Sequence, residues 1–92
     1  MSIMNEFAIQ KELASLTNWI YVNNSIEKDF IFENFTEALD FINKVGALAE
    51  KMNHHPEINN VYNKVKLRLT THDAKGITQK DFDLALAVYL IS

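Results

Sequence analysis

The segment that decides the fold runs from Glu50 to Asp81 and reads EKMNHHPEINNVYNKVKLRLTTHDAKGITQKD. Pro56 ends the helical pattern that enters this segment, because a proline pushes the residue before it out of the helical region. Residues 65–70 alternate apolar and polar side chains, which is typical of a strand with one buried face. Thr78 and Asp81 are spaced as a cap pair that opens a helix. The segment therefore predicts a helix end, a pair of strands and a helix start.

The remaining sequence predicts a matching first half. In chain order, we expect a short amphipathic helix at 6–16, strands at 19–22 and 26–33 joined by an Asn-Asn-Ser turn, a long helix from the cap Asn34 to Met52 or Asn53, strands at 57–62 and 65–70, and a last helix from Thr78. The order α-β-β-α-β-β-α favours one α+β domain over residues 1–92. It would have two layers, with helices on one face of a four-stranded antiparallel sheet. His72, on the polar parity of its strand, would lie on the open face or at the sheet edge.

The long helix is apolar on more than one face. Its apolar residues include Phe35, Ala38, Leu39, Phe41, Ile42, Val45, Leu48, Ala49 and Met52. A helix this broadly apolar is either deeply buried or packed against two partners. We expect one partner to be the sheet and the other to be the same helix of a second subunit, in a homodimer or homotetramer. Gly46 would permit either that close approach or tight packing on the sheet, and the sequence leaves both open.

Composition excludes several classes of function. The 92 residues carry a net charge of −3 and no extended basic cluster, which argues against nucleic acid and anionic membranes as partners. The absence of cysteine excludes disulfides, thiol catalysis and cysteine-based metal sites. No apolar run approaches the roughly 20 residues of a membrane helix, and the N-terminus lacks a signal-peptide pattern. We therefore expect a cytoplasmic protein.

All three histidines, His54, His55 and His72, fall within the quoted segment. Histidine is the side chain whose unperturbed form exchanges a proton near neutral pH, so the cluster predicts an acid–base site or a metal site. Pro56 should hold His55 extended and send the two neighbouring imidazoles in different directions. That divergence, and the lack of an H-x-x-x-H spacing, disfavours a catalytic zinc site, which needs converging ligands. A purely structural alternative is that the pair favours the negative end of the helix.

The motif also carries a resemblance to a known family. The matching residues are the run Glu50 to Glu57, Asn60-Val61-Tyr62, Val65, Leu69, Thr71-His72-Asp73, Gly76, Thr78 and Asp81, with Trp19, Phe30-x-Phe32-x-x-Phe35 and Ala38 in the first half. This pattern closely resembles the pterin-4a-carbinolamine dehydratases. The resemblance implies dehydration of 4a-hydroxytetrahydropterin to quinonoid dihydropterin, a step that recycles the tetrahydropterin. It also implies a small-molecule pterin substrate, with no metal and no organic cofactor.

The resemblance assigns the three histidines to catalysis. Losing water from a carbinolamine requires protonation of the departing hydroxyl and deprotonation of a ring N–H, and imidazoles do both efficiently. We expect His54 and His72 to be the proton-transfer pair and His55 to bind or orient the pterin.

Three further residues are candidate substrate contacts. Asp81 matches an acidic residue of the family's site, and it could orient an imidazole, bind the pterin or simply complement the helix dipole. Pro56 matches the motif proline, and Glu57 is either a pterin contact or a solvated acid. Two departures from the family, Asn53 and Ile58, replace an aspartate and a tryptophan common in animal members, which leaves the substrate contacts open.

A non-enzymatic function is the alternative from a different class. The broad apolar helix and an open sheet could recruit a partner protein, and a fold can be kept without its activity. Some members of the family double as dimerisation cofactors of a homeodomain transcription factor, but nothing in this sequence supports that role. Trp19 is interpreted as a core residue rather than a stacking platform for the pterin.

Overall fold

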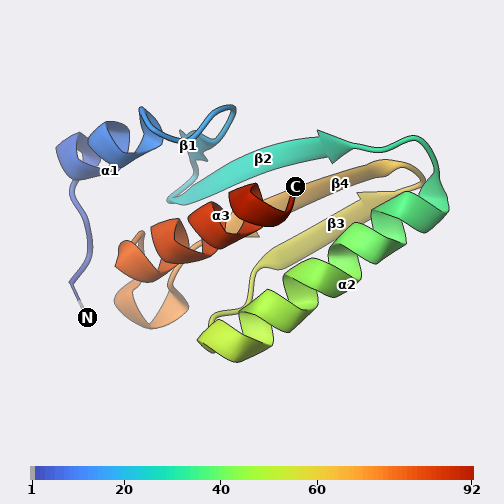
Figure 1. Cartoon of the computed structure of the whole chain (residues 1–92). Coiled ribbons are helices and arrows are strands. Elements are labelled where there is room, and N and C mark those ends of the chain that lie inside the picture. Colours follow the sequence, from blue (N-terminus) through green and yellow to red (C-terminus); the bar gives the residue numbers. More distant parts are fainter. Residues whose placement is uncertain (1) are drawn as a thin grey trace.

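Four antiparallel strands form one sheet in the order β1-β2-β4-β3, as drawn in Figure 1. The computed structural model describes residues 2–92. Its elements are α1 (Glu6–Leu13), β1 (Ile20–Val22), β2 (Ser25–Ile31), α2 (Phe35–Met52), β3 (Glu57–Val61), β4 (Lys64–Leu69), the 3₁₀ helix η1 (His72–Ala74) and α3 (Gln79–Ile91). The predicted two-layer α+β fold is confirmed, and α2 and α3 lie side by side over one face of the sheet.

Both hairpins use two-residue turns, each with at least one residue in the left-handed region. Asn23 and Asn24 have φ values of 49° and 64° and join β1 to β2, which suits asparagine because it tolerates this region. Ser25 is already the first residue of β2, one position earlier than predicted. The second turn is Tyr62–Asn63 rather than the predicted Asn63–Lys64, since Val61 pairs with Lys64.

The two faces of the sheet differ in polarity. On β4, Val65, Leu67 and Leu69 are buried against the helices. The opposite face carries ion pairs between strands, including Arg68 Nε 3.4 Å from Glu27 Oε2. This alternation is the reason that the period-two pattern predicted β4 correctly.

Helix α2 begins at a capped end, as predicted. The side chain of Asn34 accepts a hydrogen bond from the Glu37 amide at 2.9 Å. The Glu37 carboxylate accepts from the Glu33 amide at 3.1 Å instead of from the cap residue itself. The helix buries Ala38, Phe41, Val45 and Ala49, and leaves Phe35 and Leu39 largely exposed.

Gly46 does not mark tight packing on the sheet. A Cβ placed at Gly46 would meet no atom within 4 Å among the described residues. That alternative was therefore wrong, because no atom packs closely enough against Gly46 to require the absence of a side chain.

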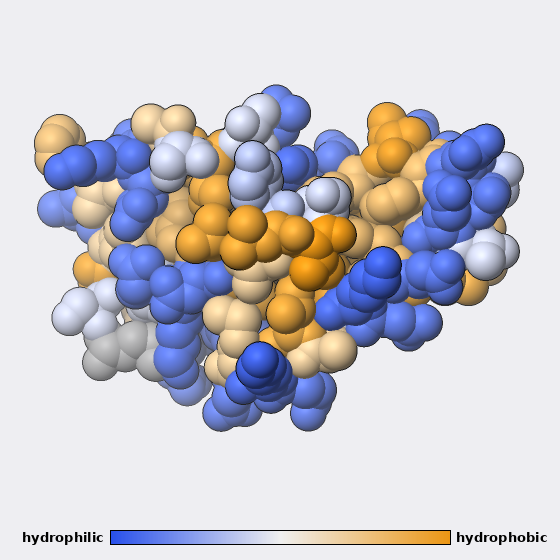
Figure 2. All heavy atoms as spheres, viewed as in Figure 1, coloured by the Kyte–Doolittle hydropathy of each residue, from blue (hydrophilic) through white to orange (hydrophobic). Residues whose placement is uncertain are grey.

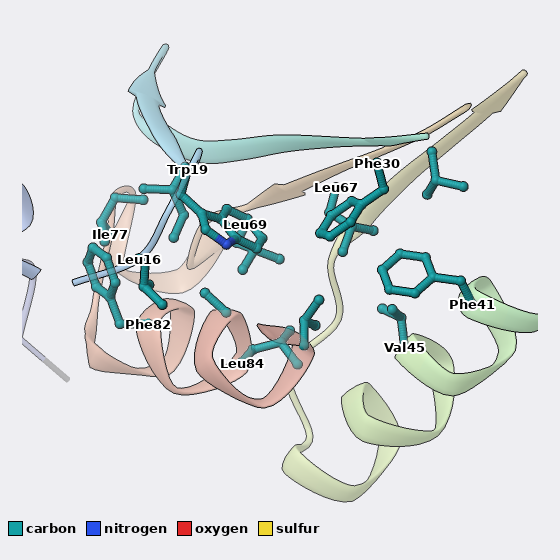
Figure 3. Packing of buried hydrophobic residues seen from close by; sticks show 14 of the residues in the cluster. Leu16, Trp19, Phe30, Phe41, Val45, Leu67, Leu69, Ile77, Phe82 and Leu84 are labelled. Carbon is teal, nitrogen blue, oxygen red and sulfur yellow. The ribbon is translucent and has the colours of Figure 1, made fainter. Parts of the chain in front are cut away.

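The core lies between the sheet and the helices. Figure 3 shows Trp19, Phe30, Leu67 and Leu69 on the sheet side facing Phe41 and other side chains of α2 and α3. The ring centroids of Phe30 and Phe41 are 4.6 Å apart, within the range of favourable aromatic pairs. Trp19 is 5% exposed, which confirms its interpretation as a core residue.

The first helix is shorter than predicted. It ends at Leu13, and the chain then turns so that Leu16 still enters the core. The apolar spacing of Leu16 was correct for burial but not for helix. A polar stretch that includes Ser15, whose hydroxyl donates to the Glu12 carbonyl at 2.9 Å, closes the helix early.

Candidate active site

His54 leaves the end of α2 in a fixed direction. Asn53 adopts a left-handed conformation with φ 51° and ψ 45°. The His54 amide donates to the Ala49 carbonyl at 3.0 Å, and the Asn53 amide donates to the Glu50 carbonyl at 3.2 Å. This pair of bonds is a Schellman helix end, with asparagine in the position that glycine usually takes.

The His54 ring contacts a buried carboxylate. Its Nε2 lies 2.6 Å from Oδ1 of Asp81 at the start of α3, and Asp81 is fully buried. The other oxygen, Oδ2, accepts hydrogen bonds from the Thr71 hydroxyl at 2.8 Å and the Thr78 amide at 2.9 Å. An ionised carboxylate only accepts, so His54 donates through Nε2–H.

The second ring nitrogen of His54 is left for solvent. Among residues 2–92, Nε1 of Trp19 is the one side-chain nitrogen or oxygen that is both buried and without a hydrogen-bond partner. Nδ1 of His54 also has no protein partner, but it is not one of these buried atoms. It is therefore in contact with solvent. Nδ1 is thus the His54 ring nitrogen that has no partner among the described residues.

Asp81 has two of the three roles that the sequence left open. Its Oδ2 closes a capping box with Thr78, so it stabilises the start of α3. Its Oδ1 binds the imidazole of His54. The capping function and the orientation of the imidazole are therefore both present, one on each carboxylate oxygen.

His72 lies beyond the end of β4, in η1, so strand parity does not set its direction. Thr71 pairs with Gly76 in an isolated antiparallel bridge, which folds the intervening residues into a tight loop. A Cβ at Gly76 would overlap the end of the Ile3 side chain, which would have to move aside. The His72 side chain is exposed and makes no protein hydrogen bond within the described part of the chain.

His55 has different surroundings from His54. Its Nε2 lies 2.7 Å from Oε1 of Glu50, with side chains that are 59% and 79% exposed. The two neighbouring imidazoles thus take different partners, as the proline following them predicted. An exposed pair of this kind contributes little to stability.

The three histidines line one pocket of about 280 Å³. It lies at the end of the molecule where α2 ends, η1 follows β4, and α3 begins (Figure 1). Its lining residues are Asn53, His54, His55, Thr70, Thr71, His72, Asp73 and Lys80. Residues 54, 55 and 72 were expected to meet around one cavity, and they do.

The other predicted contacts lie outside this lining. Asp81 is behind His54, and neither Pro56 nor Glu57 lines the pocket. Their assignment to pterin binding stays a prediction. Sequence reasoning did not single out Thr71 or Lys80. The inward parity of β4, continued past Leu69, would have placed Thr71 among the buried side chains.

Within residues 2–92, no three His, Cys, Asp or Glu side chains are grouped so that they could hold one metal ion. Over the same residues, no helix has both the length and the apolar character needed to cross a membrane.

The fold and the site together define a small α+β protein with a histidine-lined pocket at one end of its sheet. A model of the Pterin 4 alpha carbinolamine dehydratase family matches residues 2–89. The chain belongs to this family, as the sequence resemblance indicated.

Similar proteins agree with that membership. A relative from Picosynechococcus sp. is 51% identical over 82 residues, covering 89% of each chain. Another from Sulfurisphaera tokodaii is 48% identical over 85 residues, covering 92% of this chain and 91% of its own. The names of both assign them provisionally to the pterin-4-alpha-carbinolamine dehydratases. A crystal structure described as a transcriptional coactivator/pterin dehydratase from Brucella melitensis superimposes with a TM-score of 0.94 at 33% identity, covering 98% of both chains.

Proposed function

We propose that this chain dehydrates 4a-hydroxytetrahydropterin to quinonoid dihydropterin and water through histidine acid–base catalysis. The observation that carries the proposal is the meeting of three imidazoles at one pocket, with one of them held by a buried carboxylate. Membership of the family supports the reaction class. By this reaction the protein would recycle a tetrahydropterin in the cytoplasm.

The chemistry needs an acid and a base at separate places on the pterin. The C4a–O bond breaks as the hydroxyl leaves with a proton, and a ring N–H gives up its proton so that its electrons form the C=N bond. His54 and His72 both line the pocket and come from different elements, the end of α2 and η1. They are the proposed proton-transfer pair, and either can serve as acid or base.

His54 is suited to repeated proton transfer. Its Nε2–H is engaged by Asp81, so Nδ1 is the atom that exchanges a proton with substrate. Asp81 would stabilise the imidazolium that forms when Nδ1 is protonated. His55, exposed at the pocket rim, would contact or orient the pterin.

Single substitutions test these roles. His54→Ala, His55→Ala and His72→Ala are each assayed by stopped-flow dehydration of a synthetic 4a-carbinolamine, with the uncatalysed rate subtracted. A true general acid or base contributes about 10²- to 10⁴-fold, so the residue 54 and 72 variants should lose that much. Lys44→Ala, on the exposed part of α2, is the control and should keep its rate. Wild-type rates in all three histidine variants would refute the proposal.

Self-association is a second proposal, carried by the exposed apolar surface. Figure 2 shows apolar side chains gathered between α2 and α3 on the helical face. Leu39 and Leu90 are 40% and 73% exposed. The edge strand β3 also leaves Val61 67% exposed. A monomer rarely leaves so much apolar surface uncovered, so a homodimer or homotetramer is the proposed assembly.

The alternative is that a different protein binds this surface. The chain would then be a non-enzymatic binding module of the same fold. The description of the Brucella melitensis structure as a coactivator is the observation that keeps this candidate. Light scattering on the purified chain decides between them: a mass of two or four copies supports self-association, and a monomer favours a different partner. Leu39→Lys should shift an assembled form toward the monomer.

A further inference from the structure

Thr71 is linked both to the carboxylate that binds His54 and to the loop that carries His72. The Thr71 hydroxyl lies 2.8 Å from Oδ2 of Asp81, the carboxylate that holds His54. The Thr71 amide donates to the Gly76 carbonyl at 3.0 Å, closing the loop that carries His72. Thr71 therefore contacts the structure behind one imidazole through its side chain, and sets the loop of the other through its backbone.

The Thr71 hydroxyl belongs to a chain of hydrogen bonds in which each donor can be assigned. Oδ2 of Asp81 can only accept, so the Thr71 hydroxyl donates its one proton to it. The Thr78 hydroxyl, 2.8 Å away, must then donate to Thr71. The Lys80 amide in turn donates to Thr78 at 3.3 Å. Each donor in this chain points toward Asp81, which also accepts the Nε2–H of His54 on its other oxygen.

Burial makes this arrangement consequential. Thr71 is 4% exposed, Thr78 is 1% exposed and Asp81 is fully buried, so water does not readily replace a missing donor. A buried carboxylate that loses one of its three donors would rotate or tilt toward the remaining ones. Since Oδ1 and Oδ2 belong to one planar group, any such movement changes the contact with Nε2 of His54.

We infer that Thr71 is a positioning residue, which fixes the Asp81 carboxylate so that His54 keeps its proton on Nε2 and presents Nδ1 to the pocket. The inference rests on the proposed function of His54. Thr71 acts on the chemistry only through Asp81 and His54, and it need not contact the reacting atoms itself.

The test compares Thr71→Val, which keeps the shape but lacks the hydroxyl, with Thr71→Ser, which restores it. Thr71→Val should lower kcat by about 10- to 100-fold, the range expected when a hydrogen bond to a charged group is lost, with little change in KM. Thr71→Ser should recover most of that loss. Asn34→Ala, at the distant end of α2, controls for a general loss of stability and should leave kcat unchanged.

A double-mutant cycle separates positioning from a merely structural role. In a His54→Ala background, Thr71→Val should cost almost nothing more, because the imidazole it positions is already absent. A second readout is the ¹⁵N spectrum of the His54 ring, which reports which nitrogen carries the proton. The wild type and the serine variant should show Nε2–H, whereas the valine variant should show a mixture of tautomers.

The results distinguish failure of the inference from failure of the proposed function. A wild-type rate in His54→Ala would remove the function on which the inference rests. Loss of rate in His54→Ala with a wild-type rate in Thr71→Val would overturn the inference alone. Additive losses in the double variant would overturn it too. If Thr71→Val does not fold, Thr71→Ala takes its place; failure of both to fold would make Thr71 a folding element and not a positioning residue.

Discussion

His54 and His55 are neighbours in the chain, but His54 and its carboxylate partner are buried whereas His55 and its partner are exposed. His54 is 9% exposed and binds a fully buried carboxylate that has two other donors. His55 binds Glu50, and both of those side chains are mostly in solvent. Both imidazoles line the same pocket and each contacts a carboxylate oxygen at nearly the same distance, 2.6 Å and 2.7 Å. Burial therefore distinguishes two imidazole–carboxylate pairs that the distance alone would make equivalent.

The largest effect on the dehydration rate is expected from replacing the buried carboxylate of the His54 pair. Asp81→Asn should lower the dehydration rate by about 10²- to 10⁴-fold, because the amide no longer stabilises the imidazolium and can present a donor to Nε2. Stopped-flow kinetics with the carbinolamine substrate measures the change. A loss smaller than about threefold would contradict the role of the buried carboxylate.

The next effect concerns Asn53, the left-handed residue that ends α2 directly before His54. Asn53 has a positive φ of 51°, and a β-branched side chain is strained there. Asn53→Val should therefore lower the free energy of unfolding by about 1–2 kcal/mol, whereas Asn53→Gly should be neutral or slightly stabilising. Urea denaturation of the two variants measures the difference. Equal stability of valine and glycine at this position would contradict the left-handed helix end.

A smaller effect is expected at the other end of the same helix. Asn34→Ala removes the cap bond to the Glu37 amide and should cost about 1 kcal/mol in the free energy of unfolding. The dehydration rate of the folded protein should not change, because Asn34 does not line the histidine pocket. Stability is read from urea denaturation and activity from the same kinetic assay. A loss of rate without a loss of stability would show coupling along α2 that the static contacts do not explain.

Local signals explain how much of the fold could be predicted. The Asn34 cap, the Pro56 boundary and the alternation in residues 65–70 each fix a backbone choice within a few residues, and each was confirmed. Two predicted boundaries were wrong. The second hairpin turns at Tyr62–Asn63, one residue before the predicted turn, and α1 ends at Leu13, three residues before its predicted end. At such places neighbouring residues are nearly equivalent in propensity, and tertiary packing decides.

The site was harder, since its defining contact joins residues 27 positions apart. The spacing of Thr78 and Asp81 predicted a helix cap correctly, but only the docking of α3 against the end of α2 brings Asp81 to His54. The role of Thr71 depends on a further contact between a strand end and that cap. No local pattern reports which carboxylate oxygen faces which donor, so these contacts required the structure.

The smallest expected effect completes the comparison of the two histidines. Glu50→Gln removes the charge that faces His55 but leaves an oxygen able to accept a hydrogen bond. Exposed pairs contribute little, so the free energy of unfolding should change by less than about 0.5 kcal/mol. The dehydration rate should stay within about threefold of wild type if the His55–Glu50 contact contributes as little to activity as exposed pairs do to stability. The kinetic assay used for Asp81→Asn and the urea denaturation used for the Asn53 variants apply without change. A loss as large as that of the Asp81 variant would mean that His55, not His54, is the imidazole whose carboxylate partner matters, because burial would then not separate the two pairs.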